Sequence, residues 1–287
     1  MVVTLDGETR DPDAPLLHAD DLAAVRGDGV FETLLVRDGR ARLTEAHLAR
    51  LANSAKLQDL PEPDLRAWRA AIEKAVAEWS AQSAAEGALR LVYSRGREGG
   101  SAPTAYVTVG ALPARVGAAR RDGVSVVTLE RGLPAHGTDA MPWLLAGAKT
   151  LSYAVNMAAL RHAARLGADD VIFLSSDGFV LEGPRSTVVI ATEVDGRLAL
   201  LTPPPWYPIL RGTTQQALFE TARAAGYDCD LQPLRLADLE AAQGIWLISA
   251  ITLGARVHTL DGRRTPDPGP LAADFARLVD AAIGDAD

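Results

Sequence analysis

The chain has 287 residues, of which 48% are hydrophobic and 23% charged, the balance of a globular protein. Its formal charge of −8 disfavours nucleic acid and anionic membrane surfaces as main partners. The single cysteine, Cys229, excludes a disulfide framework and a cysteine-ligated metal cluster. No stretch reaches the roughly 18 apolar residues of a membrane span, and the first residues lack signal-peptide features, so we expect a cytoplasmic protein.

Four Asp-Gly pairs interrupt aliphatic or β-branched runs along the chain. Asp and Gly tolerate the positive φ angles of a two-residue turn, so each pair predicts a β-hairpin. The pairs are Asp38-Gly39, Asp177-Gly178, Asp195-Gly196 and Asp261-Gly262. The first three are expected to pair Phe31–Val36 with Arg40–Leu43, Val171–Leu174 with Phe179–Leu181, and Val188–Val194 with Arg197–Leu201.

Helices are expected between these hairpins. Thr44 and Asp64 are of the residue types that cap helix N-termini, and Gly167 and Gly226 of the type that follows a C-terminus. The expected helices run from Thr44 through Leu51, over Leu65–Ala81, from Lys149 to Leu166, from Thr213 to Ala225, and over about Leu271–Ile283.

A change of composition near Pro113–Arg121 predicts a domain boundary, because the expected strand Thr104–Val109 gives way there to a Pro/Gly/Arg-rich stretch. Strands and helices do not alternate regularly enough for a doubly wound sheet. The sequence therefore predicts two domains of mixed α and β structure, 1–115 and 121–287, joined by a linker at about 116–120.

Several common kinds of catalytic site find no support in the sequence. The five histidines show no metal-binding spacing, and there is no Gly-x-Ser-x-Gly elbow, no phosphate-binding Walker loop and no dinucleotide fingerprint. Hydrolase, kinase and dehydrogenase functions are therefore disfavoured, and no metal is expected.

Four other features carry candidate chemistry. Lys149 lies in an apolar stretch at the start of an expected helix, where its amine could react with a carbonyl, although lysines at such places commonly reach solvent. Glu182 closes a strand and is either an exposed strand end or a buried carboxylate with a cationic partner. Gly212-Thr213-Thr214 opens a helix and is either an anion site or an ordinary N-terminus. Arg50 alone is an average surface arginine. Together they match the needs of pyridoxal phosphate, namely an imine-forming lysine, a carboxylate for the ring nitrogen and a phosphate site.

Five short motifs follow one another along the chain: Gly27-Asp28-Gly29-Val30-Phe31-Glu32-Thr33, His47-Leu48-Ala49-Arg50-Leu51, Ala148-Lys149, Leu181-Glu182-Gly183-Pro184-Arg185-Ser186-Thr187 and Gly212-Thr213-Thr214. In this order and spacing the sequence resembles the class IV pyridoxal-phosphate enzymes, from about Leu17 to Val257. That family includes branched-chain aminotransferases, D-amino acid aminotransferases and 4-amino-4-deoxychorismate lyases. The resemblance is closest to the lyases of actinobacterial type.

The resemblance implies a fold-type IV enzyme, with a small N-terminal α/β domain, a larger β-rich C-terminal domain and pyridoxal 5'-phosphate (PLP) between them, usually as a homodimer. Lys149 would bind the cofactor covalently and then move the proton at the amine-bearing carbon of the substrate. Glu182 would pair with the pyridine nitrogen. The other cofactor-binding residues that it implies are Arg50, Thr213 and Thr214, the main-chain amides around Ala250, Ile251 and Thr252, and Tyr153 at the phenolic oxygen.

Two departures from the transaminase pattern favour the lyase branch. Phe31 stands where D-amino acid aminotransferases commonly have Tyr, and Gly100 and Ala102 stand where they have an Arg-x-His carboxylate clamp. Arg95 or Arg97 would then meet a substrate carboxylate. The expected activity is conversion of 4-amino-4-deoxychorismate to 4-aminobenzoate and pyruvate, a step towards folate. A D-amino acid or branched-chain aminotransferase, possible also as a second activity, and a non-catalytic binding protein remain the alternatives.

Overall fold

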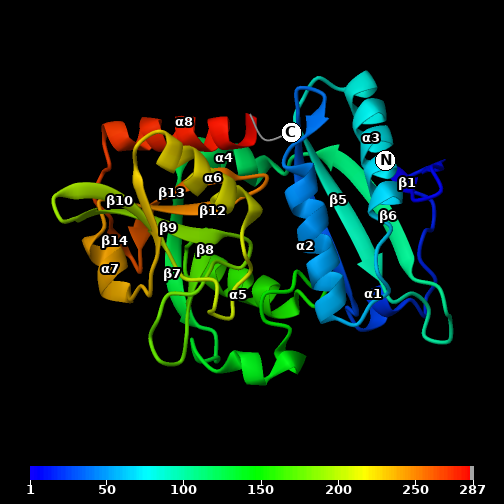
Figure 1. The fold of residues 1–287 in the computed structure, drawn as a ribbon, viewed down its shortest axis with the longest axis horizontal. Coiled ribbons are helices and arrows are strands. Elements are labelled where there is room, and N and C mark those ends of the chain that lie inside the picture. Colours follow the sequence, from blue (N-terminus) through cyan, green and yellow to red (C-terminus); the bar gives the residue numbers. More distant parts are fainter. Residues whose placement is uncertain (285–287) are drawn as a thin grey trace. The chain divides into compact units, whose positions relative to one another are not determined.

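The computed structural model describes residues 1–284, so the last three residues of the expected second domain lie outside the described part. The chain divides into two compact units. The first unit consists of Met1–Pro113 together with Ala148–Tyr153, and the second of Ala114–Gly147 together with residues 154–284. Both contain a sheet and helices (Figure 1), which confirms the expected mixed α/β class.

The first unit is an antiparallel sheet with two long helices on one face (Figure 1). Its strand order is β2-β1-β6-β5-β3-β4. The elements are β1 (Val2–Thr4), β2 (Thr9–Arg10), α1 (Leu22–Val25), β3 (Gly29–Arg37), β4 (Arg40–Ala41), α2 (Thr44–Leu57), α3 (Leu65–Gln82), β5 (Gly87–Ser94) and β6 (Thr104–Ala111).

Alternation along the strands explains the core of this unit. Val30, Leu34 and Val36 are buried on β3, and they pack with helix residues such as Leu51 and Trp68, both of which are fully buried. Every second side chain of a strand points to the same face, so this pattern directs one face of the sheet toward α2 and α3.

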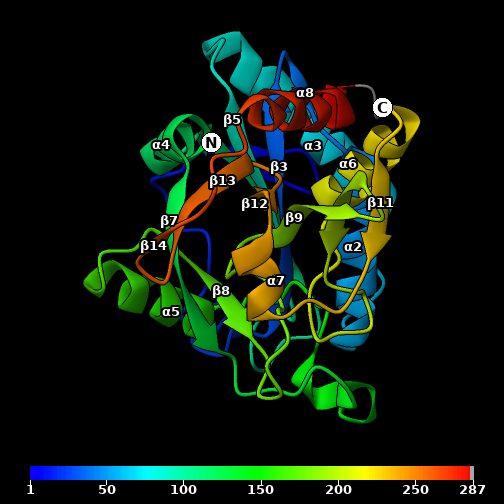
Figure 2. The same ribbon diagram turned by 90° about the vertical axis from the view of Figure 1, so that its left-hand side faces the viewer.

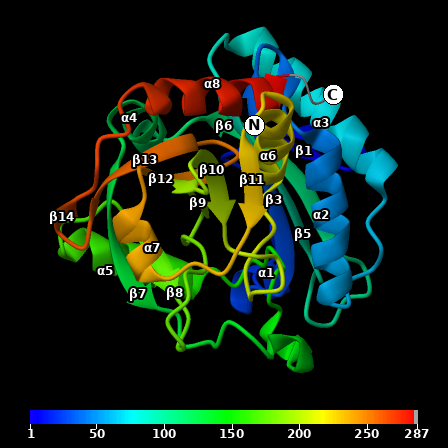
Figure 3. The same ribbon diagram turned by 60° about the vertical axis from the view of Figure 1, so that its left-hand side comes forward.

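The second unit contains a mixed sheet in the order β11-β10-β9-β12-β13-β7-β8, with β14 paired to β13. Helices α6 and α8 pack together against β12 and β13 (Figure 2, Figure 3), where Trp246 stacks on Phe275 at 4.1 Å between ring centroids. The elements are α4 (Ala114–Asp122), β7 (Val124–Glu130), the 3-10 turns η1 (Thr138–Ala140) and η2 (Pro142–Leu144), α5 (Ala154–Arg165), β8 (Asp170–Leu174), β9 (Thr187–Val194), β10 (Arg197–Thr202), α6 (Thr213–Ala224), β11 (Asp228–Leu231), α7 (Leu236–Ala241), β12 (Gly244–Ser249), β13 (Leu253–Leu260), β14 (Arg263–Arg264) and α8 (Pro270–Gly284).

The Asp-Gly turns form as the sequence predicts. Asp38-Gly39, Asp195-Gly196 and Asp261-Gly262 all have positive φ at both residues and join β3 to β4, β9 to β10, and β13 to β14. The pair Asp177-Gly178 differs, because only Gly178 has positive φ and the pairing across it is limited to the neighbourhood of the Leu174–Val180 bridge.

Three local predictions need correction. Thr44 does not cap its helix: Leu43 is the N-cap residue and the Thr44 hydroxyl donates to the carbonyl of Ala41. The expected linker at 116–120 lies within α4, whose Val116 is fully buried and so anchors a stretch with linker-like composition. The helix expected from Lys149 begins only at Ala154.

Candidate functional site

Lys149 lies in an extended segment rather than a helix. The N–H of Phe31 donates to the Lys149 carbonyl at 3.0 Å, and the N–H of Leu151 donates to the carbonyl of Gly29 at 2.7 Å. Strand β4 pairs only with Val36 and Arg37 of β3. The edge of β3 near Gly29 is therefore not covered by β4, and the segment around Lys149 pairs there. Thr150 bridges to Val30 and the chain bends at Leu151 before α5 begins, so pairing with β3 outweighs the local helical tendency of this segment.

A second contact fixes the Lys149 backbone from the other side. Its N–H donates to the Ser54 hydroxyl at 3.1 Å, and Ser54, on α2, is fully buried. The main chain of Lys149 is therefore held by both a strand and a helix of the same unit.

Two aromatic rings surround the Lys149 amine within the first unit. Its Nζ lies 4.6 Å from the ring centroid of Phe31 and 6.0 Å from that of Tyr153. The two rings meet edge to face at 5.4 Å. The structure thus brings together three residues of the predicted site, and the rings replace part of the water around the amine.

Arg50 belongs to a buried ionic cluster. Its Nε and Nη2 donate to Oε1 and Oε2 of Glu32 at 2.7 and 2.8 Å, and Nδ1 of His47 lies 2.7 Å from Glu32 Oε2. Glu32 is fully buried, whereas 12% of the Arg50 side chain is exposed. The guanidinium plane is fixed by this two-point contact.

Burial and charge set the ionisation of this cluster. Burial raises the pKa of Glu32, but the Arg50 charge and its hydrogen bonds, helped by His47, outweigh it and hold the pKa well below its usual range. Burial lowers the pKa of His47; the charge and hydrogen bond of Glu32 oppose this, but together with the charges of Arg50 and Lys149 burial outweighs them and the pKa stays below its usual value. Glu32 is therefore ionised near neutral pH, while His47 is neutral and its Nδ1–H donates to the carboxylate.

Glu32 and His47 stand within the sequence motifs, but the motifs alone assign them no role. A signal for both was present: Glu32 shares the core-facing side of β3 with Val30 and Leu34. A carboxylate in such an alternation requires buried cationic or hydrogen-bonding partners, and His47 and Arg50 supply them one helical turn apart.

In the second unit, Glu182 follows the loop after β8. Its Oε2 accepts from the N–H of Leu210 at 3.1 Å, and its carbonyl accepts from the N–H of Phe173 at 2.9 Å. The side chain is half-buried. Glu182 thus lies beside the segment that leads into α6.

The N-terminus of α6 has the form of an anion cradle. Thr213 and Thr214 are buried there, and the N-cap residue is Gly212, which has no side chain to cap the helix. Within residues 1–284, the buried Oγ1 of Thr214 has no hydrogen-bond partner. A Cβ at Gly212 would lie only 2.4 Å from Thr187 Oγ1, so the close approach there requires glycine. Helix amides and an unsatisfied hydroxyl fit a phosphate group.

Ile251 and Thr252 occupy the turn between β12 and β13. The Ile251 carbonyl accepts from Arg120 Nη2 at 2.5 Å, and the Thr252 N–H donates to Ser249 Oγ at 3.2 Å. These contacts fix the turn, while the expected role of its amides in phosphate binding stays a prediction.

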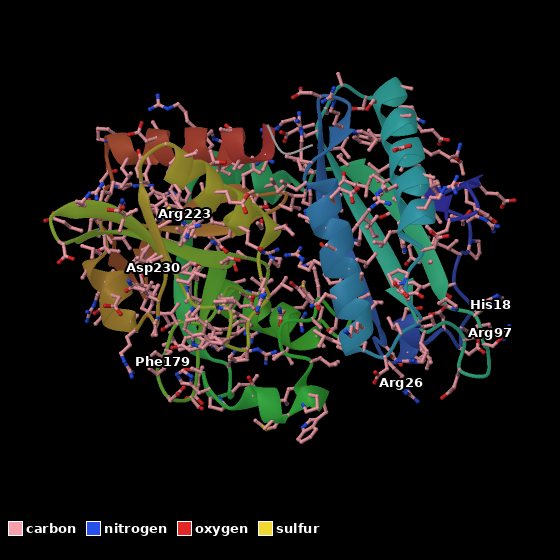
Figure 4. All side chains as sticks on the ribbon, in the orientation of Figure 1. His18, Arg26, Arg97, Phe179, Arg223 and Asp230 are labelled. Carbon is pink, nitrogen blue, oxygen red and sulfur yellow. The ribbon has the colours of Figure 1, made fainter. Side chains whose placement is uncertain are left out.

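The two candidate substrate arginines differ in their surroundings. Arg95 donates to Asp28 Oδ2 and to the carbonyl of Gln58, both at 2.7 Å, and to the carbonyl of Asp59 at 3.2 Å. Arg97 pairs through Nε with Asp20 at 2.9 Å, and 53% of its side chain is exposed in the loop after β5 (Figure 4). Arg95 thus joins Asp28 to the end of α2, whereas Arg97 lies at the surface.

The described part of the chain carries neither a cluster of metal-ligand side chains nor a membrane-spanning helix. Residues 1–284 hold no group of three His, Cys, Asp or Glu side chains that could bind a metal ion. None of the helices in this range combines the length and the apolar character that crossing a membrane requires.

The two sheets with their helices match the fold of fold-type IV aminotransferase structures. The family model described as "Amino-transferase class IV" matches residues 29–260, and the chain belongs to that family.

Known relatives extend this similarity over the whole chain. The sequence is 74% identical over 286 residues, or 99% of both chains, to a "Bifunctional aminodeoxychorismate lyase / D-amino acid transaminase" of Mycobacterium tuberculosis. The structure of "A hypothetical aminotransferase from Mycobacterium tuberculosis, PLP-bound form" is similar with a TM-score of 0.97, 74% identity and 100% of both chains covered. A 4-amino-4-deoxychorismate lyase from Pseudomonas aeruginosa has a TM-score of 0.75 and 25% identity, with 93% of this chain and 96% of that chain covered.

Proposed function

We propose that the protein is a PLP-dependent aminodeoxychorismate lyase, which converts 4-amino-4-deoxychorismate to 4-aminobenzoate and pyruvate, and that it also transaminates D-amino acids. The observation that carries this proposal is the 74% identity, over 99% of both chains, to the bifunctional relative of M. tuberculosis. The site residues support it, because the chain retains a lysine, a carboxylate and a phosphate-type cradle at the motif positions.

Lys149 is the residue we propose to bind the cofactor covalently. The sequence has only three lysines. Lys56 is exposed, and Lys74 pairs with Glu78 at 2.7 Å on the surface of α3, whereas the Lys149 amine lies against two aromatic rings. PLP, when bound, supplies an aldehyde for the amine and a ring that takes up electrons.

The other residues take roles that follow their chemistry. With the cofactor bound, the Lys149 amine would take the proton from the amine-bearing carbon of the substrate. The Glu182 carboxylate holds a proton on the pyridine nitrogen. Arg50, Thr213 and Thr214 bind the phosphate, with the amides around Ile251 and Thr252, and Tyr153 meets the phenolic oxygen.

The lyase is proposed as the main activity because the transaminase clamp is missing. Gly100 and Ala102 offer no polar side chain to an α-carboxylate. Of the two nearby arginines, we propose Arg97 as the partner of a substrate carboxylate, because the guanidinium of Arg95 is engaged by Asp28 and two carbonyls, whereas Arg97 pairs with Asp20 through Nε at an exposed position. Phe31, beside the amine, contributes an apolar contact.

The decisive experiment uses purified protein loaded with PLP. With aminodeoxychorismate we expect 4-aminobenzoate and pyruvate in equal amounts, and with D-alanine and 2-oxoglutarate a slower transfer to D-glutamate. Lys149→Ala is expected to lose both activities, and Lys74→Ala neither. D-Glutamate without 4-aminobenzoate would favour the transaminase alternative, and a protein that binds no PLP would favour the non-catalytic one.

We also propose a cytoplasmic homodimer that serves folate synthesis. Large apolar side chains lie exposed on the second unit, Trp143 at 72% and Val155 at 52%, which is typical of a surface covered by a partner. Analytical ultracentrifugation should give twice the chain mass of 30.3 kDa. Cell fractionation should recover the protein with the cytoplasm. A strain that requires 4-aminobenzoate for lack of its lyase should grow without it when given this chain.

A further inference from the structure

We propose that Glu32, assisted by His47, is a positioning residue that fixes the orientation of the Arg50 guanidinium for the phosphate of the cofactor. This inference rests on the proposed function in one respect, namely that Arg50 binds that phosphate. It adds two residues, from a strand and a helix, that would act on the cofactor through Arg50.

The geometry of the contact supports orientation rather than simple charge pairing. Three donors meet the two oxygens of Glu32: Arg50 Nε at 2.7 Å, Arg50 Nη2 at 2.8 Å and His47 Nδ1 at 2.7 Å. Two parallel bonds prevent rotation of the guanidinium about its own axis, and the third prevents rotation of the carboxylate. An arginine without such a partner samples many rotamers, and ordering it costs free energy on binding.

The elements that carry these side chains are themselves firmly held. Glu32 lies on β3, which pairs with β5 along its full register from Gly29 to Val36. His47 and Arg50 project from α2, whose buried face includes Leu48 and Leu51. A fully buried carboxylate is costly unless it is paired with a cation. Glu32 therefore depends on the arginine that α2 holds beside β3.

Charge alone gives a different expectation. Glu32 is an anion close to Arg50, and it opposes the approach of another anion, so its value for phosphate binding lies in geometry. Glu32→Asp separates the two effects: it keeps the negative charge but withdraws the carboxylate by one methylene. Glu45 offers a matched control, because it makes the same two-point contact with Arg69, at 2.6 and 2.7 Å, on the exposed side of α2.

The test compares the affinities of the apo-protein for PLP and for pyridoxal, which lacks the phosphate, by absorbance titration. The dissociation constant for pyridoxal divided by that for PLP measures the contribution of the phosphate to binding. Damage that weakens the binding of both ligands equally cancels in this ratio. We expect Glu32→Asp to reduce this ratio about tenfold, as for the loss of a charge-assisted hydrogen bond. Glu45→Asp should leave it unchanged. In an Arg50→Ala background, Glu32→Asp should have no further effect on the ratio.

His47 variants provide a second measurement if Glu32→Asp does not fold. His47→Leu removes the N–H that holds Glu32, and we expect the ratio to fall about threefold. His47→Asn replaces it with an amide N–H at an equivalent position and should restore most of the ratio.

The outcomes separate this inference from the proposed function. If Arg50→Ala lowers the ratio but Glu32→Asp or His47→Leu leaves it unchanged, the positioning role alone is overturned. A ratio that Arg50→Ala leaves intact overturns both the positioning role and the assignment of Arg50 to the phosphate.

Discussion

Replacing Ser54 by Ala tests how the reactive lysine is held. The Ser54 hydroxyl accepts the Lys149 N–H at 3.1 Å and is fully buried. The substitution removes one oxygen and leaves almost no cavity, so the lost acceptor dominates its effect. Depriving a buried amide of its acceptor costs about 1–3 kcal/mol. We expect a decrease of about 1.5 kcal/mol in the free energy of unfolding.

The substitution should also act on cofactor binding, because the Lys149 main chain keeps its strand contacts but loses the contact to α2. An energy of about 1.5 kcal/mol corresponds to roughly a tenfold change in an equilibrium constant. We therefore expect Ser54→Ala to bind PLP about tenfold more weakly, measured by absorbance titration, with a parallel loss in urea unfolding.

Ser80→Ala is the matched control for this experiment. Ser80 is exposed near the end of α3 in the same unit, and its replacement should change the free energy of unfolding by less than about 0.5 kcal/mol. If Ser54→Ala matches this control in both stability and PLP affinity, the hydrogen bond to Lys149 contributes nothing and the reasoning is wrong.

Three further predictions follow from single contacts. Gly212→Ala places a Cβ 2.4 Å from Thr187 Oγ1, so it should weaken PLP binding and destabilise the fold by about 1–3 kcal/mol. Gly110→Ala, whose Cβ meets nothing within 4 Å, should leave the affinity for PLP unchanged. If the two variants bind PLP equally well, the N-terminus of α6 does not hold the phosphate. The pKa of Glu32 is depressed in the folded state, so its contribution to stability is complete above the pKa of the unfolded chain and is lost as the pH falls from there toward the folded pKa. Glu32→Gln should therefore flatten the decline of the unfolding free energy between about pH 5 and 3. An unchanged slope would refute the buried ion pair. Burial raises the pKa of the Cys229 thiol to about 11. Iodoacetamide at pH 8 should therefore modify this thiol much more slowly in the folded protein than in urea, and equal rates would argue against its burial.

Local signals predicted the parts of the fold that local chemistry determines. The Asp-Gly turns form because their two residues accept positive φ wherever they occur. Asp64 caps α3 as expected, since its carboxylate accepts from the N–H groups of Arg66 and Ala67.

The segment around Lys149 shows where such signals fail. Its residues permit a helix, but hydrogen bonds to the edge of β3 at Gly29 and Phe31, more than a hundred positions earlier, hold it in a β-bridge instead. A contact of this kind depends on which strand edge is left open, and a single sequence does not reveal that.

The site was predicted to the extent that its motifs could be matched. Lys149, Phe31 and Tyr153 were singled out, and they lie together in the first unit. The motifs do not reveal the partnership of Arg50 with Glu32, because a motif match indicates what Arg50 could bind and not which side chain holds its guanidinium. The buried carboxylate on an apolar strand face was the available clue.

The central claim is that the amine of Lys149 forms the covalent bond to PLP. Borohydride reduction of the PLP-loaded protein, followed by peptide mass spectrometry, tests this directly, because the chain offers only Lys56, Lys74 and Lys149 as side-chain amines. We predict a stoichiometric phosphopyridoxyl group on the peptide containing Lys149 and none on the other two. A label on Lys56 or Lys74, or an unmodified Lys149 in fully loaded protein, would contradict it.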